Sequence, residues 1–503
     1  MRFLLYLVTV LFLGACEVKA EYIYKTDNTR VVNGLLFDIN GEVVTGIFET
    51  FYDNNIIKTR EPYVKGVLNG VAQYFDEKGR KVSDKPFVDG KLQGDVLVYF
   101  PSGKLKEKIP YKKDVMTGVK RVYYSDGTVK ERLPYELGVL NGNIKTYYRN
   151  GKLKESYFVE NGLKHGEFYA YFKDGDLAEK ANYENDKIEG VREIYYFNGV
   201  LKSKITYENG MKNGEMANYF DNGALEAVVM YKDDYIDGEG KFYKNSGELN
   251  LSVMYKNSIR QGEAKSYYHD GSVKIVTNYI DDAKNGVEKE YYPNGIIKSE
   301  KNYEYGYVNG LGREYYETAV LKSEINYENA VAEGLSKFYN ENGNLISEAN
   351  YSGGKKNGVE RKFNEIGKIL SESTYVNDVL CGEYKEYFDN DKVKLTALYD
   401  KGVLNGLALE YYDDGNILYE IPYVNGKKEG VVRKYYETGE VMAEITYEKN
   451  KKHGMLDAFN KDGTLMAKVL FEKDLAIKGY SLENGKNPKL MTDEELKVMN
   501  EGY

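Results

Sequence analysis

The sequence predicts an all-β fold: one elongated antiparallel β-meander of about 18 hairpins, followed by a short C-terminal helix. Three observations predict it: a glycine that recurs every 24 residues from Gly46 to Gly454, aromatic residues at fixed distances from that glycine, and two turn-forming positions within each 24 residues. Self-similarity at a fixed period is typical of repeat architectures. The 503 residues therefore indicate one repeat array, rather than the three or four domains that length alone suggests.

Each repeat reads as a hairpin when residues are counted from its recurrent glycine, position 0. Position 5 is Tyr or Phe in every repeat, and position 17 is aromatic in all but one, which has Val159. Position 9 is usually Gly, preceded by Asp or Asn in ten repeats, and position 20 is usually Gly, Asp or Asn. Asp-Gly and Asn-Gly are strong hairpin signals, whereas two turns per 24 residues would interrupt any helix.

The faces of the sheet follow from strand alternation, as the repeat that starts at Gly190 illustrates. Successive side chains of a strand point to opposite faces. Positions 11, 13, 15 and 17 should therefore share a face, with Leu201, Ile205 and Tyr207 pointing one way and Lys202 and Lys204 the other.

Tyrosine marks both faces, because positions 5, 6 and 17 hold 38 of the 51 tyrosines. Cross-strand packing is the most direct interpretation, since a tyrosine ring can be buried while its hydroxyl stays in water. The alternative is a ligand platform along position 5. Its candidate binding residues are Tyr195, Tyr219, Tyr243, Tyr267, Tyr291 and Tyr315.

Proline predicts where strand pairing stops. Position 16 is proline in five repeats, and proline cannot donate a ladder hydrogen bond. The second strand should therefore end before this position. The prolines are Pro62, Pro86, Pro110, Pro134 and Pro422.

Position 14 changes charge along the chain. One interpretation is that these are charges of the strands exposed to solvent. The other is that the change of sign supports head-to-tail association of chains or binding of a dipolar partner. The early residues are Arg60, Lys108, Arg132, Lys180 and Lys204, and the later ones Glu300, Glu324, Glu348, Glu372, Glu420 and Glu444.

The two ends are expected to cap the array. Residues 22–45 are strand-like but out of phase, so they could cover the first sheet edge, which otherwise invites aggregation. Thr492 and Glu495 form a capping box that predicts a helix over 493–500, with Met491 and Leu496 as a hydrophobic staple. The predicted organisation is a signal peptide (1–15), an anchor and N-terminal cap (16–45), eighteen repeats (46–477) and a C-terminal cap (478–503).

The N-terminus predicts export. An apolar run over residues 3–13 follows Met1 and Arg2, which suits a signal peptide and is too short to span a bilayer. Leu13-Gly14-Ala15-Cys16 resembles the lipobox of bacterial lipoproteins, although an ordinary signal peptide cut near Ala15 or Ala20 is an alternative. We expect lipidated Cys16 to anchor the chain to the bacterial envelope, at the outer membrane or cell surface. Cys381 is then an inert turn residue.

Composition argues against several functions. The net charge is -9, and the sequence lacks the basic stripe that a nucleic-acid-binding surface requires. Three His and two Cys leave little material for metal binding or His-dependent catalysis, and no phosphate loop or nucleophile elbow is present. Acidic pairs such as Asp233-Asp234 and Asp281-Asp282 read as turn residues. We expect a non-enzymatic protein with no catalytic residues, metal or cofactor.

The repeat resembles a known family. Its pattern Gly-x4-Tyr-Tyr-x2-Gly-x-Leu-x5-Tyr-x-Asn-Gly-Lys-x2-Gly is similar to the variant MORN repeat (membrane occupation and recognition nexus), and Lys164-His165-Gly166 and Lys452-His453-Gly454 match that family's Lys-x-His-Gly corner. The resemblance covers about residues 46–477. It implies an extended antiparallel meander that serves as a protein or membrane scaffold. Bacterial members include YwqK-type antitoxin components, from which this chain departs in its lipobox, repeat number and lack of Trp.

Three binding functions follow as hypotheses. The first is a lipid-anchored envelope scaffold or adhesin that holds a protein partner, such as a surface protein, a host protein or a toxin. The second is an antitoxin or immunity component, which rests on the family resemblance alone. The third is glycan or lipid binding along the tyrosine-rich sheet.

Overall fold

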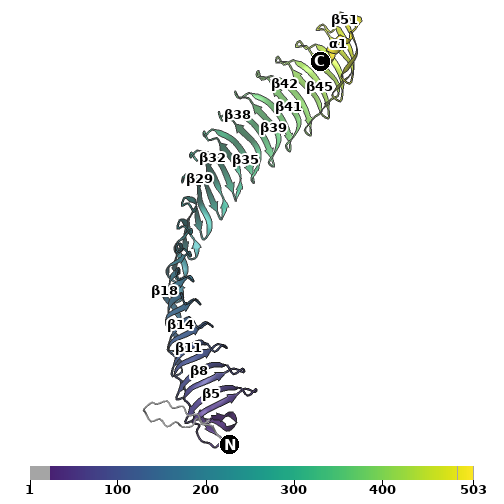
Figure 1. Cartoon of the computed structure of the whole chain (residues 1–503). Helices are drawn as coiled ribbons and strands as arrows, with labels where there is room; N and C mark the ends of the chain where they lie inside the picture. Colours follow the sequence, from purple (N-terminus) through teal and green to yellow (C-terminus); the bar gives the residue numbers. More distant parts are fainter. Residues whose placement is uncertain (1–22, 484, 502–503) are drawn as a thin grey trace. The chain divides into compact units, whose positions relative to one another are not determined.

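The computed structural model describes residues 23–483 and 485–501, and almost all of their regular secondary structure is β-strand. The chain divides into two compact units, Met1–Ile236 with Asn245–Gly247, and Asp237–Lys244 with Glu248–Tyr503. In each unit, strands that follow one another in sequence pair side by side, as Figure 1 shows for β5 (Ile57–Val64) to β18 (Leu163–Tyr171) and for β29 (Val273–Ile280) to β51 (Leu475–Glu483). The predicted all-β meander is confirmed.

Every repeat has the same strand boundaries. The first strand spans positions 0–5 and the second spans positions 11–18, as in β4 (Gly46–Phe51) and β5. Positions 21–22 form a short strand, such as β6 (Val67–Leu68), that pairs back onto the second strand. In six places this short strand continues into the next first strand. These longer strands are β18, β23 (Met211–Tyr219), β28 (Ile259–Tyr267), β39 (Lys355–Phe363), β41 (Val379–Tyr387) and β49 (Lys451–Phe459).

A β-bulge in each hairpin changes the predicted faces. Between β21 (Gly190–Tyr195) and β22 (Leu201–Glu208), Ile194 lies opposite Ser203 but the next residue, Tyr195, lies opposite Leu201. Lys202 is therefore an extra residue, and an extra residue reverses the alternation beyond it. Leu201 shares a face with Tyr195 and Lys204, so its predicted place beside Ile205 and Tyr207 is wrong.

The register defines two faces, because residues directly opposite each other in a sheet share a face. The core face carries positions 0, 2, 4, 13, 15 and 17, and the tyrosine face carries positions 1, 3, 5, 11, 14 and 16. Most of the buried hydrophobic residues lie at positions 2 and 15 of the core face, which oppose each other at mid-strand. Examples are Ile144, Ile205, Val229, Val432, Leu456 and Val469.

Proline does not end the second strand. Pro62 lies within β5 opposite Ile47, and its carbonyl accepts a hydrogen bond from the Asn69 backbone N–H at 2.8 Å. Prediction failed here because Pro62 faces the irregular step at Asn69 and Gly70, between β6 and β7 (Gly70–Phe75), where no regular ladder bond is lost. The glycine matters as well: it has φ +118°, and a Cβ there would come within 2.8 Å of the Pro62 ring.

The first turn is a five-residue loop over positions 6–10 that needs a left-handed residue at position 9. The three repeats without glycine place Asn55, Ala319 and Asp391 there, with φ of +65°, +67° and +65°. The Asn or Asp at position 8 accepts from the backbone N–H of position 10, as Asn198 does from Val200 at 3.0 Å.

Tyrosine hydroxyls join consecutive repeats at these turns. Each tyrosine at position 6 donates to the backbone carbonyl of position 5 in the next repeat, at 2.7 to 2.9 Å. The second tyrosine of the Tyr-Tyr pair therefore has a structural role. The donors are Tyr52, Tyr124, Tyr148, Tyr196, Tyr268, Tyr292, Tyr316, Tyr412 and Tyr436.

The N-terminal segment covers the first strand, as expected. β1 (Ile23–Lys25) pairs with β4 in parallel orientation, which makes this end of the sheet mixed rather than purely antiparallel. A one-turn 3-10 helix (Thr26–Asn28) leads to the hairpin of β2 (Thr29–Val32) and β3 (Leu35–Asp38). Leu36 of β3 is buried and its backbone N–H donates to the Gly66 carbonyl at 2.9 Å.

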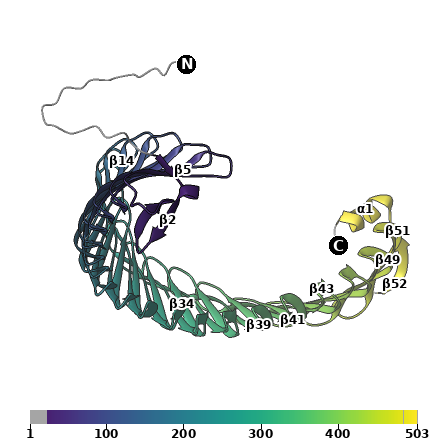
Figure 2. The same ribbon diagram turned by 90° about the horizontal axis from the view of Figure 1, so that it is seen from below.

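The C-terminal end carries the predicted helix. β51 and β52 (Lys486–Leu490) extend the sheet, and α1 (Asp493–Glu501) lies beside them (Figure 2). The capping box is present: the Thr492 backbone N–H donates to Glu495 Oε2 at 2.7 Å, and the Glu495 N–H donates to Thr492 Oγ1 at 3.2 Å. Met491 and Leu496 pack on the core face over Gly479.

Candidate functional surfaces

The predicted binding tyrosines are half-buried residues of the tyrosine face, each at the end of a first strand. Tyr195 and Tyr219 belong to the first unit, while the other four belong to the second. Within each unit the structure therefore places them in one row. In the row of the second unit, Tyr243 ends the first strand of the first hairpin and Tyr291 ends that of the third.

Three hydroxyls of this row lie beside an acid or a hydroxyl of the same face. Tyr195 donates to Glu193 Oε2 at 2.8 Å; burial, followed by this contact, raises the pKa of Tyr195 to about 12. Tyr315 donates to Glu300 Oε2 at 3.3 Å, and Tyr267 lies 3.2 Å from Ser252 Oγ. These contacts stabilise the sheet and leave the rings as the part of the row that can meet a partner.

In the second unit, the row continues into a network of tyrosine, glutamate and arginine. Glu372 accepts from Arg361 Nε at 2.7 Å and from the Tyr387 hydroxyl at 2.8 Å. The Arg361 guanidinium holds the pKa of Glu372 below its usual value, while burial, followed by Glu372, raises the pKa of Tyr387 to about 12. Arg361 also contacts Glu348 at 3.2 Å, so one guanidinium lies between two carboxylates.

These contacts compensate the acidic part of the position-14 row. Its glutamates pair with bases at position 3, as Glu300 does with Lys289 at 3.1 Å and Glu324 with Arg313 at 3.0 Å. The sign change along position 14 is present in sequence, but the second unit does not carry a one-sign acidic stripe there. The hypothesis of head-to-tail association through this row loses its electrostatic basis.

An exposed apolar row, not predicted from the sequence, runs beside the charges at positions 1 and 16. Positions 1 and 16 oppose each other, and every hairpin except two has an apolar side chain at one of them. At position 1, Val71 is 50% exposed and Leu407 is 45% exposed. A signal existed, because an apolar residue directly follows the recurrent glycine in most repeats. Exposed members are Val71, Val119, Val191, Met230, Met254, Val287, Leu311, Leu335, Leu398, Leu407, Val431, Met455 and Leu470.

The core face carries basic residues over aromatic rings. A Lys or Arg at position 22 lies over the position-17 ring of the following repeat in several places. Arg260 lies 4.3 Å from the Tyr279 ring centre, and Lys284 lies 4.7 Å from the Tyr303 ring centre. Such contacts stabilise a surface by about 0.5 to 1 kcal/mol each.

Other candidate residues have structural roles. Asp233, Asp234, Asp281 and Asp282 have left-handed backbones in the second turn, and Asp282 Oδ1 accepts from the Arg260 backbone N–H at 2.9 Å. In the described part of the chain, no three His, Cys, Asp or Glu side chains are grouped to hold a metal ion.

The structure describes only one of the two cysteines, Cys381. Cys381 lies inside β41 and is half-buried, so its predicted place in a turn is wrong. Cys16 lies outside the described residues. No helix within residues 23–483 and 485–501 has the length and apolar character needed to cross a membrane.

Two of the solved structures that match the chain are distant in sequence. A crystal structure of TcdB2-TccC3-Cdc42 is 11% identical, with 90% of this chain and 26% of that chain covered and a TM-score of 0.14. The Tc holotoxin pore of Photorhabdus luminescens is also 11% identical, with 89% and 27% covered and a TM-score of 0.14. The chain spans about a quarter of the length of these structures, and nothing about its function follows from them. No curated protein matches the chain.

The family comparison is more informative. The model described as MORN repeat variant matches eleven segments, all in phase with the 24-residue period and found in both units. The segments are 92–113, 116–136, 140–161, 164–185, 188–209, 260–281, 284–305, 332–352, 380–401, 404–425 and 428–449. The matched segments therefore identify variant MORN repeats in both units.

Proposed function

We propose that the protein is a non-enzymatic repeat scaffold that holds a protein partner along its tyrosine face. MORN repeats in general build non-enzymatic scaffolds for protein or membrane interaction. The observation that carries the proposal is the exposed apolar row at positions 1 and 16, which lies beside compensated charges and half-buried tyrosine rings.

This surface has the composition of a protein interface. Interface cores are enriched in Tyr, Met and Arg and depleted in other charged residues. The tyrosine face offers Met230, Met254 and Met455 in the apolar row, and in the second unit its arginines Arg313, Arg361 and Arg433 are paired with glutamates. Because the pattern recurs in each hairpin, a partner can gain contact area by engaging several successive repeats.

We propose further that the chain is exported and held at the bacterial envelope by lipid on Cys16. The support is the apolar segment 3–13 followed by Leu13-Gly14-Ala15-Cys16. Acyl chains stabilise membrane attachment by about 0.8 kcal/mol per buried methylene. Metabolic labelling with an alkyne fatty acid should mark the wild type but not Cys16→Ser, and the variant should leave the membrane fraction. Equal labelling of both would refute the anchor.

The scaffold proposal is tested by comparing two sets of exposed apolar side chains. Full chains purified in mild detergent are cross-linked to envelope extracts, and captured proteins are identified. The triple variant Val287→Lys, Leu311→Lys, Leu335→Lys should lose the partner that the wild type captures. The control variant Ile346→Lys, Leu370→Lys changes similarly exposed apolar residues at position 12, the bulge position, and should keep it.

The outcomes separate the hypotheses. Loss of the partner only in the triple variant supports the tyrosine face as the interface. Equal capture by both variants would overturn it. Capture of a toxin encoded by a neighbouring gene would make the scaffold an antitoxin or immunity protein. Binding only to glycans or liposomes would replace the protein partner with those ligands.

A further inference from the structure

A row of basic residues crosses the tyrosine face of the first unit, at positions 14 and 3 of successive repeats (β11 and β14 in Figure 1). The register places each residue opposite the next: Lys108 faces Arg121, Arg121 faces Arg132, and Arg132 faces Lys145. These four residues form the basic row. They belong to β11 (Leu105–Lys112), β13 (Gly118–Tyr123), β14 (Val129–Glu136) and β16 (Gly142–Tyr147).

The facing pair Arg121 and Arg132 is an exception in the array. Like charges directly opposite each other destabilise a sheet. In every other hairpin, the residues that face each other at positions 3 and 14 have opposite charges, or at least one of them is uncharged. Arg433 and Glu444 are such a pair, with an ion pair at 2.5 Å. The basic row therefore carries an electrostatic cost that the other hairpins avoid.

Most of the basic row lacks an acidic neighbour. Lys108 forms an ion pair with Asp95 at 2.6 Å, which closes one end of the row. Among the residues that the structure describes, no ion pair of Arg121, Arg132 or Lys145 is found, and Arg132 and Lys145 are exposed. The tyrosine face of their two repeats has no acidic residue at all. Three positive charges are therefore left to solvent or to a partner.

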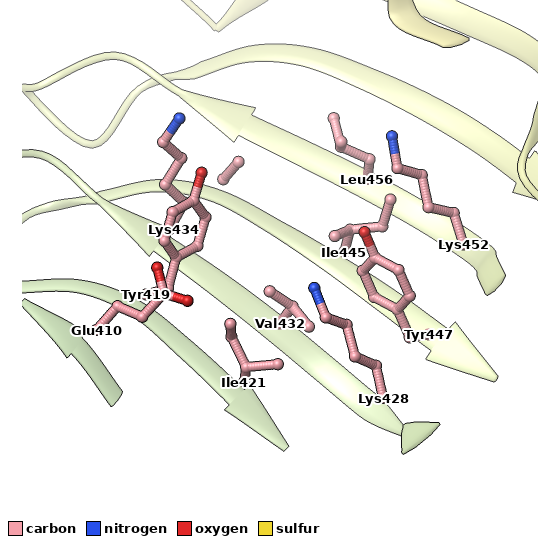
Figure 3. Close-up of a pocket in the computed structure, with 11 residues that line it drawn as sticks. Glu410, Tyr419, Ile421, Lys428, Val432, Lys434, Ile445, Tyr447, Lys452 and Leu456 are labelled. Atoms are coloured by element: carbon pink, nitrogen blue, oxygen red, sulfur yellow. The ribbon is translucent and has the colours of Figure 1, made fainter. Parts of the chain in front are cut away.

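Basic residues on the core face have a different arrangement. In the second unit, Lys428 lies 5.5 Å from the Tyr447 ring centre, and Figure 3 shows it beside aliphatic side chains such as Val432. In the basic row, Arg132 also lies over a ring, 5.7 Å from the Tyr147 ring centre, but the residues that face it on both sides are bases. The repulsion within the basic row is thus a property of this part of the tyrosine face.

Apolar and aromatic side chains flank the basic row. Tyr123 and Tyr147 lie on one side, at position 5. The other side, at positions 1 and 16, holds Pro110, Val119, Pro134 and Phe158. Strands about 4.8 Å apart make the row about 14 Å long, which about ten residues of a helix or four to five residues of an extended chain would span. A ligand of this size meets positive charge at its centre and apolar surface on both sides.

We propose that the basic row binds an acidic segment of the protein partner, with carboxylates on Arg121, Arg132 and Lys145 and apolar side chains on the flanking rows. The inference rests on the proposed function, because it places part of the same partner on the tyrosine face. Guanidinium groups suit this role, since their hydrogen bonds to carboxylates are charge-assisted and can be bidentate.

A phosphate polymer is the other polyanion to consider. It has no aliphatic side chains to place on Val119 or Pro134. A nucleic-acid base would need an open ring face for stacking, and at Tyr147 the Arg132 guanidinium already lies over the ring. These contacts favour a protein segment.

Fluorescence anisotropy on the full chain in mild detergent tests the proposal, with a labelled random copolymer of Glu and Leu as the probe. Poly-glutamate supplies carboxylates without apolar side chains, and polyphosphate and oligothymidylate represent the other polyanions. We expect the copolymer to bind at least tenfold more tightly than each of these three, and to lose affinity as the salt concentration rises. Equal or tighter binding of any of the three would overturn the proposal.

Arg132→Glu separates a binding role from a structural one. It gives the hairpin the arrangement of Arg313 and Glu324, which form an ion pair at 3.0 Å at the same positions. Hydrogen exchange of β13 and β14 should therefore be no faster than in the wild type, while binding of the copolymer falls at least tenfold. Lys145→Gln, a milder change of an exposed side chain, should weaken binding about threefold.

The matched control is Lys106→Glu, which makes the same change of charge at the exposed bulge position of β11. It should weaken binding less than threefold. Unchanged binding in Arg132→Glu, or an equal loss in Arg132→Glu and Lys106→Glu, would overturn the proposal.

This proposal and the proposed function can fail separately. Both are compared by capture of the partner from envelope extracts. If the triple variant of Val287, Leu311 and Leu335 loses the partner and Arg132→Glu keeps it, the tyrosine face remains the interface and the acidic segment is refuted. If Arg132→Glu loses the partner and the triple variant keeps it, the acidic segment is supported and the apolar row of the second unit is not the interface.

Discussion

The tyrosine pair Tyr291-Tyr292 separates the two roles of tyrosine within one repeat. The Tyr292 hydroxyl donates to the Tyr315 carbonyl of the next repeat at 2.9 Å, whereas no hydrogen bond of the Tyr291 hydroxyl is found among the described residues. A hydrogen bond of this kind contributes about 1 kcal/mol net. Tyr292→Phe should therefore destabilise the junction by about 1 kcal/mol, and Tyr291→Phe should change it by a few tenths at most.

Native-state hydrogen exchange is the suitable assay, because a long repeat array opens locally and its global unfolding is not all-or-none. A loss of about 1 kcal/mol makes local opening about fivefold more frequent. Amides of β31 (Gly286–Tyr291) and β34 (Gly310–Tyr315) should exchange about fivefold faster in Tyr292→Phe than in Tyr291→Phe. Equal exchange in the two variants would refute the structural role of the position-6 hydroxyl.

Three further predictions concern glycine, alkaline pH and the C-terminal cap. Gly70→Ala should destabilise its hairpin by several kcal/mol more than Gly334→Ala. A Cβ at Gly70 would lie 2.8 Å from the Pro62 ring, whereas a Cβ at Gly334 would have no such neighbour within 4 Å among the described residues. Similar melting curves of the two variants would contradict this. Burial raises the pKa of Tyr387 from 10.0 to about 12, so its contribution is complete below pH 10 and is lost as pH rises towards 12. Tyr387→Phe should flatten that loss in alkaline unfolding curves, and an unchanged slope would argue against it. Thr492→Ala removes a helix cap worth about 1 kcal/mol, so limited proteolysis should cut α1 sooner than in the wild type; equal cleavage rates would count against the cap.

The 24-residue period made the fold predictable, because glycine, aromatic residues and turn residues each recur at fixed positions. Alternation alone could not reveal the bulge. Position 11 is apolar in every repeat except the one with Lys81, and position 12 is often charged, as in Leu201 and Lys202, so the pattern of a regular strand continues through the extra residue. The prediction from the prolines was wrong for a related reason. Whether a missing N–H costs a hydrogen bond depends on the neighbouring strand, and Pro62 faces the irregular break in strand pairing at Gly70.

The candidate surfaces were predictable only in part. The position-5 row followed from counting tyrosines, but the compensation of Glu324 by Arg313 needed the register that brings positions 3 and 14 together. The surface that Lys428, Lys434 and Val432 share on the core face required three dimensions, since these residues come from two successive strands, Lys427–Lys428 and Gly430–Tyr435.

The partner of the tyrosine face can be argued from where its hydroxyls are used. At Tyr315, Tyr339 and Tyr387 the hydroxyl donates to a glutamate of the same face, and the rings are half-buried. Stacking of sugars needs open ring faces and free polar groups around them, and these tyrosines supply neither in full. An apolar row such as Leu311, Leu335 and Leu407, between 38% and 45% exposed, suits side chains of a folded partner instead. The exposed apolar row therefore supports the proposed protein partner over the glycan alternative for this face.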